Sequence, residues 1–149
     1  MQLIKDKQVI QDNWVYILDE TPLDADYIIV PLVRWQQERD QLSKVKHLGL
    51  RLESDAVLED IVDNLSHFQL VELFIPVFTD GRAFTHARLL RSRYGFTSDI
   101  RVSGDFMRDQ VFYLNRVGVS SFELNDQDNA QQVIQSMGDF SVDSQESVA

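Results

Sequence analysis

Residues 70–94 carry the sequence LVELFIPVFTDGRAFTHARLLRSRY. Its first eight residues, Leu70 to Val77, form a nearly continuous apolar run, which is typical of a strand covered on both faces. The polar residues 78–82 follow, and Thr79 or Asp80 can cap a helix that continues to about Tyr94. A strand, a polar junction and a helix in this order indicate one unit of an α/β fold.

The same unit recurs on both sides of this segment. Further apolar strands are predicted at 27–32, 48–52, 100–102 and 122–124, and further helices at 35–45, 58–65, 105–117 and 126–137. Ser54 or Asp55 and Asp105 are the expected caps of two of these helices. About five βα units predict a mostly parallel sheet flanked by helices. An open doubly wound sheet and a partial βα barrel both fit this pattern, and the open sheet is the first expectation.

Glycines recur at similar positions in the repeated βα units. Gly49, Gly95 and Gly118 each precede a predicted strand, and we expect them to end the preceding helices in a left-handed conformation. The first 20 residues differ, since two short apolar runs flank Asp12-Asn13. That pattern predicts an N-terminal β-hairpin or arm with its turn at Asp12-Asn13.

The length of 149 residues predicts one α/β domain, which we place at residues 1–137. Residues 138–149 are expected to be a mobile acidic tail, because six acidic residues and no basic one follow from Glu123 onward. No apolar run approaches 18 residues and the N-terminus lacks the pattern of a signal peptide. We therefore expect a cytoplasmic protein without a membrane segment.

Composition excludes several kinds of chemistry. The chain has no cysteine, so thiolate catalysis, disulfides and cysteine-ligated metals are excluded, and the three scattered histidines do not suggest a metal site. Nucleotide-binding and hydrolase motifs are also missing, so no cofactor is indicated and its identity stays unknown. The net charge of −10 argues against nucleic-acid binding, which needs a broad basic face.

Positive charge is nevertheless concentrated in one place. Residues 78–118 hold seven arginines and four aspartates, which leaves seven basic and twenty acidic residues elsewhere. In parallel α/β sheets, ligands bind beyond the carboxyl ends of the strands. The candidate ligand-binding residues at that edge are Thr79, Asp80, Gly81, Arg82, His86, Ser103, Asp105, Arg108 and Asp109.

These candidates allow two interpretations. If the strands before them are neighbours, Asp80, Arg82, Asp105 and Arg108 converge, and the helix start with Arg82 could hold a small anion. The same residues could be ordinary helix caps and a structural ion-pair network. Further along the helix, Ala83, Ala87, Leu90 and Tyr94 form the expected buried stripe, whereas Arg88, Arg91 and Arg93 are candidates for a partner surface or simply solvated charge.

Several stretches resemble the signature of an uncharacterised bacterial family, domain of unknown function 934. They are Ile75 to Arg91, Asp99 to Gln110, Val119 to Leu124 and Val30 to Trp35. Family members are often encoded beside assimilatory sulfite-reduction genes and carry an oxidoreductase label for that reason. The resemblance implies a role near sulfite reduction in a bacterium and no catalytic residue. Many relatives have cysteine where this chain has Val117, so a redox role of that thiol is not available here.

Three functional hypotheses follow, and whether the protein is an enzyme stays open. The first is an accessory or binding protein of assimilatory sulfite reduction, with the sulfite-reduction enzymes as partners. The second is an enzyme or sensor that acts on a small anionic ligand at the strand ends. The third is an oxidoreductase. Exposed edge strands and the N-terminal arm would also allow a homodimer.

Overall fold

A computed structural model describes residues 2–17, 23–125, 130–135 and 137. Its centre is an eight-stranded sheet with the order β2-β1-β8-β7-β6-β5-β4-β3. The strands β3 to β8 are parallel, whereas β1 pairs antiparallel with both β8 and β2. The strands are β1 (Gln2–Lys5), β2 (Gln8–Ile10), β3 (Val15–Tyr16), β4 (Tyr27–Pro31), β5 (His47–Leu52), β6 (Leu70–Ile75), β7 (Asp99–Gly104) and β8 (Ser121–Leu124).

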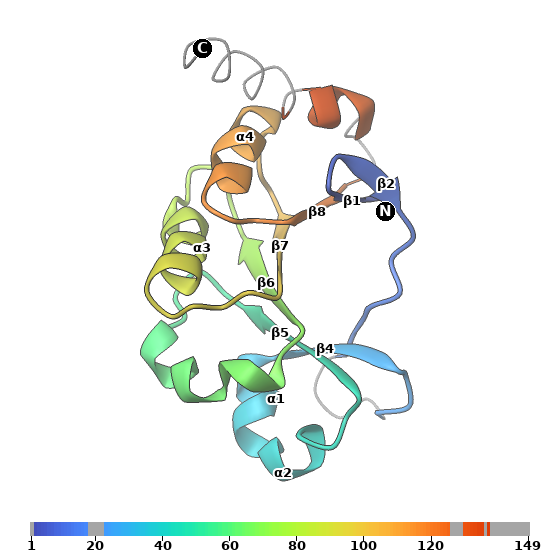
Figure 1. Ribbon diagram of the computed structural model, residues 1–149, viewed down its shortest axis with the longest axis vertical. Helices are drawn as coiled ribbons and strands as arrows, with labels where there is room; N and C mark the ends of the chain where they lie inside the picture. The colour runs from blue at the N-terminus through green and yellow to red at the C-terminus, as the bar shows by residue number, and fades with distance from the viewer. Residues whose placement is uncertain (1, 18–22, 126–129, 136, 138–149) are drawn as a thin grey trace.

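The sheet is curled into a half-barrel, and the chain connectivity explains why. Its two edge strands, β2 and β3, are joined by only residues 11–14. Five Cα steps reach at most about 18 Å, whereas eight strands laid flat would separate the edges by about 34 Å. The short connection therefore requires a curved sheet, and Figure 1 shows it passing along the open side of the sheet, opposite α3 and α4. The predicted mostly parallel sheet flanked by helices is confirmed, and of its two expected forms the structure has the partial βα barrel. The open doubly wound sheet, the first expectation, is not found, because the parallel strands follow one another in chain order without reversal.

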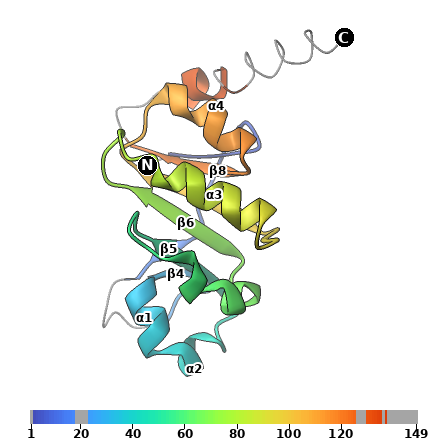
Figure 2. The same cartoon turned by 90° about the vertical axis from the view of Figure 1, so that its left-hand side faces the viewer.

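The helices cover the outer face of the sheet, as Figure 2 shows. This placement follows when successive parallel strands are neighbours and every crossover is right-handed. The buried outer side chains of β5 to β8 pack with the helices in one core cluster that includes Ala83, Leu90, Val111 and Leu114. The helical segments are α1 (Leu32–Gln37), α2 (Arg39–Leu42), η1 (Leu58–Asp60), η2 (Val62–His67), α3 (Arg82–Ser92), α4 (Arg108–Arg116) and a short helix at 130–135.

Several local expectations need correction. The N-terminal hairpin exists, but its turn is at Asp6-Lys7, where both residues have positive φ angles of 53° and 64°, as tight hairpin turns require. Asp12-Asn13 instead lies in the segment that joins the two sheet edges. Gly49 lies inside β5, not at a helix end, whereas Gly95 and Gly118 have the expected positive φ.

Two predicted helices also differ. Residues 58–65 form the 3₁₀ segments η1 and η2, in keeping with the modest helix propensity of their isoleucine, valine, aspartate and asparagine residues. The helix expected at 35–45 begins at Leu32 and is interrupted at Glu38. Part of the predicted helix at 126–137 and the whole tail 138–149 lie outside the described residues. None of the helices in the described ranges is long and apolar enough to cross a membrane.

Candidate functional site

The concave face of the half-barrel is polar. In four successive strands a charged residue stands between two buried apolar ones: Leu50-Arg51-Leu52, Val71-Glu72-Leu73, Ile100-Arg101-Val102 and Phe122-Glu123-Leu124. Because side chains alternate between the two faces of a strand, the apolar residues meet the helices and the charged ones point inward. Arg51 lies opposite Glu72, and Glu72 lies opposite Arg101. The inner face therefore carries a row of alternating charges where a closed barrel would have a packed core.

Arg101 anchors this row to the N-terminal segment. Only 2% of its side chain is exposed, and its Nη1 and Nη2 atoms donate to the two carboxylate oxygens of Asp12, each at 3.1 Å. Asp12 belongs to the connection between β2 and β3, so this bidentate pair holds the connection against the sheet. The charge of Arg101 is thus committed to a structural contact.

Glu72 is the buried acid of the row. The Ser103 hydroxyl donates to its Oε2 at 3.0 Å, and Arg51 Nε lies 3.3 Å from the same oxygen. Burial raises the pKa of Glu72, and the charge of Glu123 adds to the increase, whereas Arg51 and the Ser103 hydrogen bond oppose it. Glu72 is therefore held in a place where its ionised form is costly.

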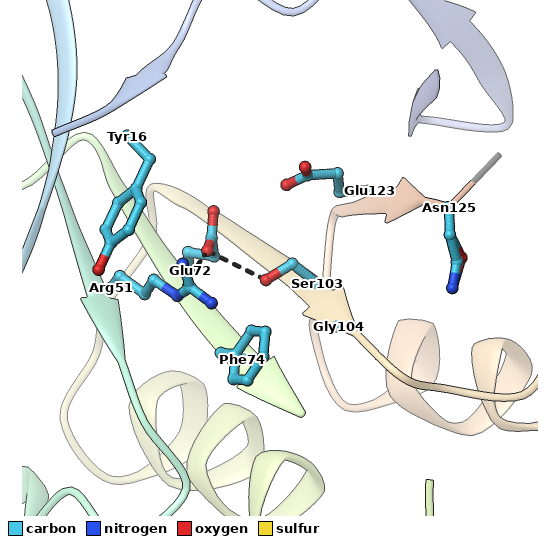
Figure 3. A pocket seen from close by; sticks show the side chains of 8 residues that line it. All are labelled: Tyr16, Arg51, Glu72, Phe74, Ser103, Gly104, Glu123 and Asn125. Atoms are coloured by element: carbon cyan, nitrogen blue, oxygen red, sulfur yellow. Dashed lines mark hydrogen bonds and ion pairs between the residues drawn. The ribbon is translucent and has the colours of Figure 1, made fainter. Parts of the chain in front are cut away.

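Arg51 is fixed between two aromatic rings. Its guanidinium carbon lies 4.5 Å from the centre of the Tyr16 ring and 4.1 Å from the centre of the Phe74 ring. Its Nε is buried and has no hydrogen-bond acceptor among the described residues, although Glu72 is close enough for an ion pair. In Figure 3 the guanidinium end points into the space between the strands. The flat cation is thus held in place by cation–π contacts, with its edge available to a ligand.

That space is a pocket of about 410 Å³ at the carboxyl ends of β5 to β8. Its size is within the range of small-molecule sites. Besides the residues described above, Figure 3 shows Glu123 and Asn125 on the side away from Arg51. The described residues that line it are Tyr16, Arg51, Glu72, Phe74, Ser103, Gly104, Glu123 and Asn125.

The site residues expected from the sequence lie mainly outside this pocket. Arg82 donates through Nε to Asp80 Oδ1 at 3.0 Å and through Nη2 to Asp80 Oδ2 at 2.8 Å, and Nη2 also reaches the Ser54 hydroxyl at 3.0 Å. The Arg82 backbone N–H donates to Asp80 as well, so Asp80 serves the first turn of α3. These bonds lower the pKa of Asp80 and raise that of Arg82. The structure therefore brings Asp80 and Arg82 together as a mutually satisfied pair.

The second group of expected residues is dispersed. Ser103 turns inward to Glu72, and Asp105 is exposed, with its backbone N–H donating to Ile75. Arg108 contacts Gln132 instead of its acidic neighbours. Across the described ranges, no ion pair joins Asp80 or Arg82 to Asp105 or Arg108. The expected convergence of two aspartates and two arginines is not formed, although β6 and β7 are neighbours.

Asp105 does not cap α4. The helix begins at Arg108, and the side chain of Gln110 accepts the Met107 backbone N–H at 2.7 Å. Gly104, with a φ of 94°, turns the chain before the helix, and the N-cap position is Met107, two residues after the expected cap. Thr79, Gly81 and Asp109 are exposed at the starts of α3 and α4.

His86 and Arg91 belong to the outer layer of the molecule. His86 is partly buried, and this burial lowers its pKa, an effect opposed by a hydrogen bond with the backbone of Ala56. Arg91 is not solvated charge, because it donates to the carbonyl oxygens of Phe96, Ser98 and Gly118. The buried stripe of α3 is confirmed for Ala83, Ala87 and Leu90.

A second, smaller pocket of about 270 Å³ lies between α3 and α4 beside Asp80 and Gly81. Phe84, Tyr113, Ala83 and Leu114 contribute to its lining, so most of its surface is apolar. No lysine or arginine is found among the described residues that line it, and its charged group is the carboxylate of Asp80. This pocket is therefore a weaker candidate for a polar ligand than the concave-face pocket.

The sequence did contain a signal for the concave-face pocket. A single charged residue flanked by apolar ones recurs in four consecutive strands, and in a half-buried strand such a residue points away from the core. Glu72 and Arg101 lie in runs that otherwise look like fully buried strands. Tyr16 and Asp12 could not be assigned to the site, because the packing of the N-terminal segment against the inner face is a long-range feature.

Comparison with known proteins identifies a family that the chain matches. A family described as bacterial protein of unknown function, DUF934, matches residues 49–149, which is more than half of the chain. No curated protein and no solved structure matches the chain significantly.

Proposed function

We propose, from the premise that the chain belongs to the bacterial DUF934 family, that it is an accessory binding protein of assimilatory sulfite reduction that holds a small ligand in the concave-face pocket. One observation carries the binding part of this proposal. The guanidinium of Arg51 is clamped between Tyr16 and Phe74 and points into a pocket of about 410 Å³. A planar cation held in this way is suited to an oxyanion or a carboxylate group.

The competing location is the outer edge around Asp80 and Arg82, where the sequence predicts the ligand-binding residues. Arg82 is 57% exposed and is bonded to both oxygens of Asp80. An anion there would have to compete with a carboxylate that is always present. Among the described residues, Arg51 forms its ion pairs through Nε, with Glu72 at 3.3 Å and with Glu53 at 3.7 Å, and neither is a bidentate pair. The inner pocket is therefore the better supported site.

The connection to sulfite reduction rests on the family resemblance and its gene neighbourhood. A role in binding is favoured over redox catalysis, because the sequence has neither a cofactor motif nor a cysteine. The enzyme and oxidoreductase hypotheses would both require turnover of a ligand bound in the same pocket.

Calorimetry tests the binding site. Sulfite, sulfate, phosphate and small carboxylates are titrated into the wild type and into the Arg51→Lys, Arg82→Ala and Arg88→Lys variants. We expect Arg51→Lys to weaken binding roughly tenfold or more, because lysine keeps the charge but loses the planar fork. Arg88→Lys is the matched control on the exposed face of α3, and it should bind as the wild type does. Loss of binding in Arg82→Ala with full binding in Arg51→Lys would move the site to the outer edge.

The pathway is tested separately in the source bacterium. A strain that lacks this gene should grow slowly on sulfate or sulfite as the sole sulfur source and normally on a reduced sulfur source. Complementation with Arg51→Lys should restore less growth than complementation with Arg88→Lys. Equal growth of the deletion strain and the wild type on sulfite would contradict the assignment to this pathway.

A further inference from the structure

We infer that the ligand of the concave-face pocket is a compact zwitterion, with its carboxylate at Arg51 and its ammonium group at Glu123, as in a free α-amino acid. This inference rests on the proposed function, since it specifies the chemistry of the ligand in the same pocket. It depends on the charge balance of the lining and on the positions of its charged groups.

The charge balance of the pocket disfavours a ligand that is only an anion. Among the residues that the structure describes, its lining contains one cation, Arg51, and two carboxylates, Glu72 and Glu123. Arg101 does not alter this balance, because its charge is matched by both oxygens of Asp12. A simple anion would neutralise Arg51 and leave the two carboxylates facing each other in a partly buried space. A ligand that also carries a positive group compensates the charge of Arg51 with its negative end and the charge of the two carboxylates with its positive end.

Glu123 provides the position for that positive group. Within the part of the chain that the structure describes, its carboxylate has no ion-pair or hydrogen-bond partner, and its charge acts unfavourably on the ionised form of Glu72. Figure 3 shows Glu123 across the pocket from Arg51, on the same side as Asn125. An ammonium group there would relieve the repulsion between the two carboxylates and could donate to the amide oxygen of Asn125.

The position of Arg51 defines the other end of the ligand. The guanidinium carbon of Arg51 lies over the rings of Tyr16 and Phe74, at 4.5 and 4.1 Å from their centres. A carboxylate of the ligand would approach the nitrogen atoms at the edge of the guanidinium. Arg51 on β5 and Glu123 on β8 are three strands apart, about 14 Å across the sheet, and Glu123 lies two residues beyond Ser121, the residue of β8 in register with Arg51. Both side chains line the same pocket. A ligand that meets both groups within a pocket of about 410 Å³ therefore carries its two opposite charges on one small molecule.

The experiment measures thermal shifts and then calorimetric affinities. The full-length protein is screened against each proteinogenic amino acid. For the amino acid with the largest shift, the analogue without its α-amino group and the analogue without its carboxylate are titrated in parallel; for alanine these are propionate and ethylamine. We expect the amino acid to bind roughly ten- to hundredfold more tightly than either analogue, as expected when one charge-assisted hydrogen-bonded group is removed.

Two variants separate the two ends of the ligand. Glu123→Gln should weaken binding of the amino acid roughly tenfold and leave the affinity for the deaminated analogue unchanged or improved. Arg51→Lys should weaken binding of both the amino acid and its deaminated analogue, because both carry the carboxylate. Glu59→Gln, an exposed glutamate on η1 outside the pocket, and Arg88→Lys are the matched controls, and thermal unfolding shows that each variant is folded.

The outcomes distinguish this inference from the proposed function. If deaminated carboxylates or inorganic oxyanions bind as tightly as the amino acid and Glu123→Gln changes nothing, the zwitterion is wrong and the anion-binding pocket stands. If neither amino acids nor anions bind, both are wrong. Binding of an amino acid that requires Arg51 and Glu123 together supports both.

Discussion

The buried guanidinium of Arg101 donates to both carboxylate oxygens of Asp12, with the two residues 89 positions apart in the sequence. Arg101 lies on β7 in the sheet interior, and Asp12 lies on the connection between the edge strands β2 and β3. This pair therefore holds the N-terminal segment across the open side of the half-barrel. The same segment leads into Tyr16, which covers one face of Arg51. The closure of the sheet and the shape of the pocket depend on each other.

Asp12→Ala should destabilise the protein by about 3 kcal/mol, the lower end of the cost of removing one partner of a buried pair. The reason is that Arg101 would keep its charge with 2% of its side chain exposed, whereas Asp12 is 31% exposed and leaves a route for water. Urea denaturation measures the difference. Asp24→Ala, a change at an exposed aspartate, is the control and should alter stability by less than about 0.5 kcal/mol. Equal stability of the two variants would show that the pair does not hold the segment.

Local patterns in the sequence were sufficient for the elements of the parallel sheet but not for its closure. Apolar runs identified β4 to β8, and the helix-stop glycines Gly95 and Gly118 supported β7 and β8, because those signals lie within a few neighbouring residues. The curled arrangement follows from strand order and from a four-residue link between distant edges. Neither has a local signal, and Asp12 was therefore predicted as a hairpin turn instead of the partner of Arg101.

A similar limit applies to the candidate site. Asp80 and Arg82 are separated by only two positions in the sequence, so their contact could be predicted from the sequence alone. Ser103 was also singled out, but its real partner is Glu72 on the neighbouring strand. The sequence located the strand ends and did not show which side chains face into the half-barrel, because that depends on the register between strands.

Gly104→Ala should destabilise the protein more than Gly95→Ala does. Both glycines have positive φ angles, 94° and 67°, so each substitution carries the backbone cost of about 1 kcal/mol. A Cβ at Gly104 would also lie 2.2 Å from the backbone oxygen of Ile75, whereas nothing lies within 4 Å of a Cβ at Gly95. Overpacking adds about 1–3 kcal/mol. Chemical denaturation of both variants measures this difference, and equal losses would contradict the close approach of β7 to β6.

The acid Glu72 should make the protein less stable as the pH rises above 4.5, the ordinary glutamate pKa. Since burial raises the pKa of Glu72 in the folded state, the folded protein keeps a proton there that the unfolded chain has released. Unfolding then releases a proton, and its free energy falls with rising pH until the raised pKa is passed. Glu72→Gln removes this contribution.

The melting temperature of Glu72→Gln relative to the wild type should therefore increase as the pH rises through that window. Scanning calorimetry over a series of pH values measures it. Glu59→Gln serves as the control for a glutamate on the outer face, and its difference from the wild type should not follow this trend. If the melting temperature of Glu72→Gln minus that of the wild type stays constant or falls with rising pH, ionisation of Glu72 does not destabilise the folded protein.

Arg91→Lys should destabilise the protein, although the sequence placed Arg91 among candidates for solvated charge. Its guanidinium donates to Gly118 O at 3.0 and 2.8 Å, to Phe96 O at 2.8 Å and to Ser98 O at 2.6 Å, so it ties the end of α3 to the loops before β7 and β8. Lysine has one nitrogen and cannot reach all three carbonyl groups, so we expect a loss of about 2 kcal/mol.

The matched substitution Arg88→Lys separates this effect from a general loss of arginine on α3. Arg88 is exposed on the same helix, three residues earlier, and its replacement should change stability by less than about 0.5 kcal/mol. Amide hydrogen exchange adds a local measurement: in Arg91→Lys, protection should fall first at residues 96–99 and 118–120, since these loops lose their common donor. If the two variants unfold at the same urea concentration and exchange alike, Arg91 is not a structural link between the loops, and the exposed face of α3 would have to be considered again as a partner surface.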